Sequence, residues 1–303
     1  MLTIRRALVI LCTCGTALSQ NAATSVAAKA LNAQAVQCRT DANSGTACHA
    51  NYSAGCGRKK DRNTRKFLPF EASYQPKYDA YLAYSKNQIP KVLPTSQGLL
   101  SKEDFVSKYQ QAAKFKNKIT TTNHADHSAE LLALGEGQYF TIVGYLYYSL
   151  VNTGGESCNC DLPDDEIASD YHIGIGFDAQ LAAVVATTDK HTLEQNSIVV
   201  EMTPHYRAKY HNGKWTSGLL ESIRGRQVKV VGQFLLDNDH MKATDVCGTP
   251  GATSAEVKSC WRLSPWELHP VTEFYICKTN SCGQDSPDWV ALDDAPGQGI
   301  GKK

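Results

Sequence analysis

Apolar and polar residues alternate along five stretches in the second half of the chain, and this two-residue period predicts half-buried β-strands. β-Branched and aromatic side chains dominate these stretches, as the first one, QYFTIVGYLYYSL, illustrates. The predicted strands are residues 138–150, 170–176, 197–203, 227–236 and 264–276. We therefore expect a mainly β fold.

A helical pattern separates the third predicted strand from the fourth. Leu219, Leu220 and Ile223 lie on one face of a short helix predicted over residues 215–223. Three strands, a helix and two strands is the element order of the OB-fold, a five-stranded barrel. An immunoglobulin-like sandwich has about seven strands and no such helix. The order therefore predicts an OB-fold-like barrel, with Gly144 at a bend or bulge of its first strand.

The segments around the barrel have weaker patterns. A helix is predicted at residues 101–118, where Ser101 and Asp104 resemble a capping box, and it joins the barrel in one domain at 101–276. Residues 21–100 are predicted to form an irregular, partly helical and partly disordered extension that contains cysteines and the basic run at 58–66. Charge runs are usually solvated surface. Residues 277–303, rich in Gly, Pro and Asp, are predicted to be a flexible tail.

The first twenty residues have the features of a secretory signal peptide. Arg5 and Arg6 precede an apolar run at 7–18, and small residues follow. The run is too short to span a bilayer, and no other segment approaches the required length. We therefore expect a secreted or periplasmic protein without a membrane span.

Nine cysteines remain after removal of residues 1–20, and an exported protein is expected to use them in disulfides. Either Cys247 pairs locally with Cys260, or these two are tied to Cys158 and Cys160. Cys277 and Cys282 are expected to close a short loop. Zinc on the Cys158/Cys160 pair, or a metal on His124, Asp126 and His127, is the less favoured alternative. We therefore predict neither a metal nor another cofactor.

The last predicted strand, SPWELHPVTEFYI, carries Glu267 and His269 inside an apolar run, where polar groups need partners. Pro270 cannot donate to a neighbouring strand, so an edge or bulge is expected there. In an OB-type barrel the third strand lies between the second and fifth, which would make His172, Glu201 and one of Glu267 or His269 neighbours on adjacent strands. Such a cluster is either a satisfied hydrogen-bond network that holds three strands together or a small acid–base or metal site.

The charge distribution bears on the choice of ligand. Residues 21–137 carry 16 Lys/Arg against 9 Asp/Glu, whereas residues 138–276 carry 10 against 17. An acidic barrel disfavours nucleic acid, because phosphate binding depends on Lys and Arg. Neither G-x-S-x-G nor H-E-x-x-H, the hydrolase and metalloprotease motifs, is present in the sequence.

The phrases ESCNC, DYHI, VVEMTP, VKVVGQFLLD…H and PWELHPVT resemble those of a family of secreted bacterial proteins with OB-like barrels and no settled activity. The resemblance covers roughly residues 135–276. It implies export and a barrel fold, and it implies no reaction.

The sequence thus favours an exported, non-catalytic OB-fold binding module for an unknown extracellular ligand: an oligosaccharide, a protein or, less favoured, nucleic acid. The alternatives are a metal-dependent hydrolase that uses His172, Glu201, Glu267 and His269, and a disulfide-stabilised structural protein of the envelope. The predicted ligand-binding residues are His172, Glu201, His205, Arg207, Glu267 and His269.

Overall fold

The computed structural model describes residues 82, 85–88, 90, 92–115, 118–120, 123–152, 158, 169–211 and 214–295. The predicted signal peptide, the basic run and most of the N-terminal extension lie outside the described residues, as does Cys160. No helix in the described part of the chain is long and apolar enough to cross a membrane.

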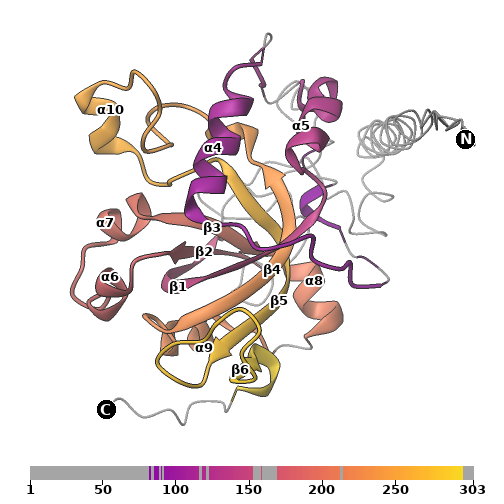
Figure 1. Ribbon diagram of the computed structural model, residues 1–303, viewed down its shortest axis with the longest axis vertical. Coiled ribbons are helices and arrows are strands. Elements are labelled where there is room, and N and C mark those ends of the chain that lie inside the picture. The colour runs from indigo at the N-terminus through magenta and orange to yellow at the C-terminus, as the bar shows by residue number, and fades with distance from the viewer. Residues whose placement is uncertain are drawn as a thin grey trace, which may run out of the picture.

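Six strands form one sheet in the order β3-β2-β1-β4-β5-β6, with antiparallel neighbours throughout (Figure 1). A parallel contact between Val200 of β3 and Leu268 of β5 brings the first five strands into a ring-like arrangement. The mainly β prediction is confirmed, and two strands have the predicted bounds. The strands are β1 (Tyr139–Asn152), β2 (Asp170–Gly176), β3 (Ser197–Met202), β4 (Gln227–Leu236), β5 (Trp266–Cys277) and β6 (Trp289–Ala291).

β6 lies in the segment predicted to be a flexible tail. It pairs with the end of β5, where Tyr275 lies opposite Ala291 and Ile276 opposite Val290. A strand of three residues is too short to show a readable alternation, which is why the sequence pattern does not reveal it.

Short helices surround the sheet. The helix predicted at 101–118 ends already at Ala112, and its capping box of Ser101 and Asp104 is confirmed. The single helix predicted between the third and fourth strands is two helices, and the first begins at Pro204, a residue that favours the first helical turn. The helices are α4 (Lys102–Ala112), η2 (His124–His127), α5 (Ser128–Leu134), α6 (Ala179–Ala183), α7 (Lys190–Gln195), α8 (Pro204–Tyr210), α9 (Ser217–Ser222), η4 (Asn238–His240), α10 (Ser254–Ser259) and η5 (Leu292–Asp294).

Two disulfides join residues that are close in sequence. Cys247 pairs with Cys260, which confirms the local alternative, and Cys277 pairs with Cys282 as expected. Cys158, predicted to be in a disulfide, is instead a buried thiol.

The ring strands place alternate residues on opposite faces, and both faces of β2, β3 and β5 are buried near the site. On one face, Ile173, Val200 and Leu268 belong to the main hydrophobic core. Residues one position along each strand point away from this core, and these include Glu201 and Glu267. The polar residues of β2, β3 and β5 therefore share the outer face of the ring.

β5 is irregular at Pro270, as predicted. The register of β4 against β5 shifts on both sides of Gly232, which lies opposite Val271. A Cβ atom on Gly232 would come within 2.9 Å of Leu268 Cβ and of Pro270 O. By contrast, β1 has its bulge between Leu146 and Tyr148 rather than at Gly144. Gly232 thus allows β4 to lie close to the first half of β5.

We predict that Gly232→Ala destabilises the protein by about 1–3 kcal/mol, because backbone and Cβ atoms must shift to admit the methyl group. Urea unfolding measures the change. Gly218→Ala is the matched control, since its Cβ would meet nothing within 4 Å and α9 gains a better helix former. Equal stability of Gly232→Ala and wild type would contradict the register of β4 and β5 given above.

Candidate functional site

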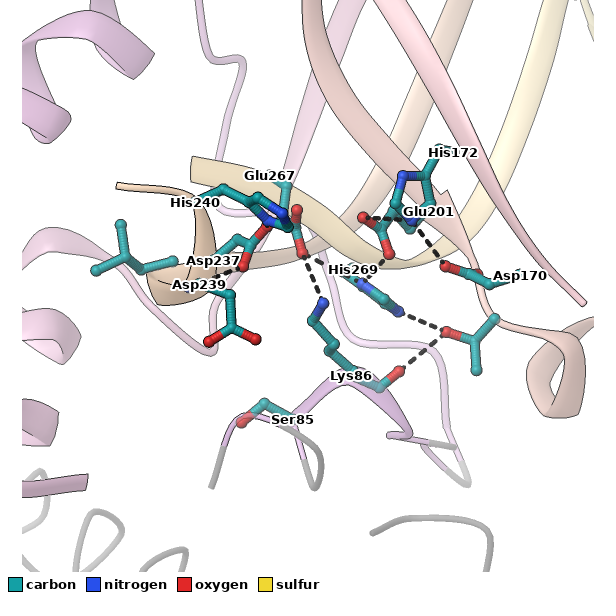
Figure 2. A network of polar contacts seen from close by, with 12 residues as sticks. Ser85, Lys86, Asp170, His172, Glu201, Asp237, Asp239, His240, Glu267 and His269 are labelled. Atoms are coloured by element: carbon teal, nitrogen blue, oxygen red, sulfur yellow. Dashed lines mark hydrogen bonds and ion pairs between the residues drawn. The ribbon is translucent and has the colours of Figure 1, made fainter. Parts of the chain in front are cut away.

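Four predicted site residues meet on the outer face of β2, β3 and β5 (Figure 2). His172 of β2 lies directly opposite Glu201 of β3. Glu267 and His269 lie two residues apart on β5, on either side of Leu268, which pairs with Val200. The neighbourhood predicted from the element order is therefore present.

Glu201 lies at the centre of this group. Its Oε1 is 3.2 Å from His172 Nε2, and its Oε2 is 2.8 Å from His269 Nδ1. The side chain is buried between these two imidazoles. Burial alone would raise its pKa, but the positive charges of His172, His269 and Lys86 hold that pKa well below the ordinary value.

Thr203 orients the imidazole of His269. The Thr203 hydroxyl donates to the carbonyl oxygen of Lys86 at 2.9 Å, and His269 Nε2 lies 2.9 Å from the same hydroxyl. Because the hydroxyl proton is already used, Nε2 is the donor in the second contact. Burial lowers the pKa of His269, but Glu201 more than offsets this and the pKa is raised well above its usual value. The Nδ1 atom thus faces the carboxylates.

A second carboxylate, Glu267, connects the cluster to buried cations. Its Oε1 is 3.2 Å from His269 Nδ1 and 4.0 Å from Lys86 Nζ. Its Oε2 is 3.5 Å from Arg262 Nη1, which also donates to Asp237 at 2.9 Å. Burial, together with the negative charges of Glu201 and Asp237, raises the pKa of Glu267 to about 7.

The ion pairs extend toward the surface through Asp237. Its Oδ2 lies 2.6 Å from Nδ1 of His240, whose side chain is one-third exposed. Burial raises the pKa of Asp237, but Lys86 and Arg262 outweigh it and keep this carboxyl ionised. A chain of charged groups therefore runs from Glu267 through Arg262 and Asp237 to His240.

On the β2 side, Asp170 and Asn152 complete the surroundings of His172. Asp170 Oδ2 is 3.6 Å from His172 Nε2, and Asn152 Nδ2 lies 3.1 Å from the same nitrogen. The His172 side chain is 16% exposed, whereas Glu201, Glu267 and His269 are at most 1% exposed. His172 is thus the part of the cluster nearest to solvent.

Three overlapping sets of potential metal ligands arise from this packing, each with its ligand atoms within 4.8 Å of one another. Glu201 belongs to two of them. The sets are Cys158 with Asp170 and His269, Asp170 with His172 and Glu201, and Glu201 with Glu267 and His269. The Cys158 thiol therefore contributes to this cluster rather than to the predicted disulfide.

Arg207, predicted to extend the site toward an anion, is buried and makes several contacts within the protein. It donates to the carbonyl oxygens of Met202, Trp215 and Ser169, and its guanidinium lies 3.6 Å from the centre of the Tyr171 ring. These contacts join α8 to β2, to β3 and to the segment before α9. His205 lies on α8, and its side chain is outside the described residues.

The histidines considered as an alternative metal site bind separate carboxylates. His124 Nε2 is 2.8 Å from Glu136, and His127 Nδ1 is 3.2 Å from Glu130. Among the described residues they belong to no group of potential metal ligands.

Five residues that contact the cluster or its ion pairs were not predicted from the sequence: Lys86, Asp170, Thr203, Asp237 and Arg262. Lys86 and Arg262 lie in segments without periodicity, so nothing in the sequence indicates that they are buried. Asp170 and Thr203 stand at the ends of predicted strands, and the signal that could reveal them is their position beside His172 and Glu201.

The cluster can carry out two kinds of chemistry. Carboxylates, imidazoles and a thiol that converge within ligand distance can bind a transition metal. A glutamate with a pKa of about 7 next to an imidazole can also exchange protons near neutral pH. Burial of Glu201, Glu267 and His269 keeps large substrates away from either.

We predict that Arg262→Met destabilises the protein by about 3–5 kcal/mol, because the substitution leaves Asp237 and Glu267 buried without their shared cation. Chemical denaturation at neutral pH measures this loss. Lys190→Met, which removes one partner of an exposed pair with Glu194, is the control and should cost less than about 1 kcal/mol. Similar small losses in both variants would show that the Arg262 ion pairs do not support the fold.

Comparison with known proteins identifies no relative, since no family, curated protein or solved structure matches the chain. The resemblance drawn from the five sequence phrases therefore stays a prediction.

Proposed function

We propose that the protein is an exported module that binds one divalent transition-metal ion between Glu201, Glu267 and His269. The observation that carries this proposal is the convergence of Glu201, Glu267 and His269, whose potential ligand atoms lie within 4.8 Å of one another in buried surroundings.

The spacing of the three side chains fits a metal ion. Zinc binds nitrogen and oxygen ligands at about 2.0–2.2 Å in tetrahedral geometry, which separates neighbouring ligand atoms by about 3.3 Å. His269 Nδ1 lies 2.8 Å from Glu201 Oε2 and 3.2 Å from Glu267 Oε1. A metal ion would take the place of the Nδ1 proton with a small expansion of the cluster.

The surroundings of His269 also fit. Metal-bound histidines usually donate their second N–H to an oxygen atom, which fixes the tautomer. The contact between Nε2 and Thr203 supplies this hydrogen bond and directs Nδ1 toward both carboxylates. Imidazole and carboxylate ligands, with a thiol close by, favour zinc and its neighbours over calcium or magnesium.

The fold and compartment are part of the proposal. The ring order β1-β2-β3-β5-β4, with α8 and α9 between β3 and β4, supports an OB-type barrel. The predicted signal at residues 1–20 and the two disulfides support export. The buried position of Glu201, Glu267 and His269 favours an enclosed ion over an oligosaccharide or protein ligand, and binding over hydrolysis of a large substrate.

A second function is favoured by one observation. Lys86 and Arg262 already supply positive charge to Glu267, so the cluster can hold β2, β3 and β5 together as a structural network without an added ion. This network is the second candidate.

We predict that the chelator-treated wild-type protein binds one equivalent of zinc and that Glu201→Gln weakens this binding at least tenfold, because an amide is a poor ligand. Competition with a chromophoric chelator measures both affinities. Glu221→Gln, at an exposed glutamate paired with Arg224, is the control and should bind like wild type.

Thermal unfolding accompanies the titration, since saturating zinc should stabilise the wild-type protein by about 2.7 kcal/mol at a hundredfold excess over Kd. Absence of stoichiometric zinc in the wild type, with the fold intact, would replace the metal proposal with the structural network.

A further inference from the structure

We propose that Lys86 is a built-in competitor of the metal: its ammonium supplies the cation beside Glu201 and Glu267, and it withdraws when the metal binds. This inference rests on the metal site proposed above. Residues 85–88 belong to the N-terminal extension. They would thus set the metal affinity of a site whose ligands lie on the strands β3 and β5.

The ammonium of Lys86 is buried among carboxylates. Only 5% of the residue is exposed, and Nζ lies 4.0 Å from Glu267 Oε1. Figure 2 shows the side chain rising from residues 85–86 toward the gap between Glu267 and His269. The same charge helps to lower the pKa values of Glu201 and Asp237, so it acts on three carboxylates together.

A divalent ion at Glu201, Glu267 and His269 would repel this ammonium. The two cations would share Glu267 within a few ångströms, inside protein that screens charge less than water does. Arg262 already supplies positive charge from the other side of Glu267. Withdrawal of Lys86 relieves the repulsion, and the carboxylates that it leaves are then available to the metal.

Hydrogen bonds from two side chains attach the backbone of residues 85–86 to the metal site. Thr203 donates to Lys86 O, and Gln233 Nε2 donates to Ser85 O at 3.0 Å and to His269 O at 3.0 Å. Thr203 also contacts His269 Nε2. A movement of the metal-bound imidazole is therefore passed directly to the segment that carries Lys86.

The consequence is reversible loading. Lys86 balances the negative charge of Glu201 and Glu267 when no metal is bound. Because this ammonium must move away before a metal binds, it lowers the affinity of the site for the metal. Lys86→Met retains the aliphatic stem and removes the charge. We expect it to bind zinc at least tenfold more tightly than the wild type, while Lys86→Arg stays within about threefold of it and Lys190→Met, at an exposed lysine, is unchanged.

These affinities are measured by competition with a chromophoric chelator on the full secreted chain, with near-ultraviolet circular dichroism as a check of folding. Equal or weaker zinc binding by folded Lys86→Met would overturn the role of Lys86 and leave the metal site standing. Zinc binding by none of the variants would instead overturn the metal site itself, and the role of Lys86 with it.

A second measurement uses only the wild type and does not depend on the folding of a variant. An amine-reactive reagent is applied with and without saturating zinc, and each lysine is quantified by mass spectrometry. We expect zinc to increase labelling of Lys86 severalfold and to leave the exposed Lys190 unchanged. Labelling of Lys86 that zinc does not increase would contradict its withdrawal.

Discussion

The burial of negative charge on the outer face of β2, β3 and β5 is the constraint on which the site depends. Glu201, Glu267 and Asp237 are fully buried, and buried carboxylates remain ionised only where cations or hydrogen-bond donors compensate them. Arg262 and Lys86 reach this face from a loop and from the N-terminal extension, and His269 reaches it from β5 itself. Ion pairs between these carboxylates and cations therefore hold together segments that are far apart in the sequence.

The ring arrangement makes this cluster possible. The parallel contact between Val200 and Leu268 places β3 between β2 and β5, so residues that face away from the core on three strands converge. Gly232 permits the close approach of β4 and the irregular start of β5 that aims Glu267 and His269 at Glu201. The same geometry serves a structural network without an ion and a metal site with one. The two differ in what compensates Glu201.

Period-two patterning was sufficient to predict β2 and β4 to the residue, and the expected strand order predicted that His172, Glu201 and one of Glu267 or His269 are neighbours. Hydrophobic patterning gave no prediction for segments in which apolar residues do not recur at a regular spacing. Lys86 and Arg262 lie in irregular segments, and nothing local distinguishes a buried cation from a solvated one. The carbonyl partners of Arg207 come from three separate segments, which no local pattern reveals, and Cys158 was expected in a disulfide because export made that the default.

The most direct test of the metal site is a crystal structure of the zinc-loaded protein with anomalous diffraction measured on both sides of the zinc absorption edge. We expect one strong anomalous peak bonded to His269 Nδ1 and to oxygens of Glu201 and Glu267, with Lys86 Nζ moved away from it. Diffraction from zinc-loaded crystals that shows no peak at these three side chains, with Lys86 still beside Glu267, would contradict it.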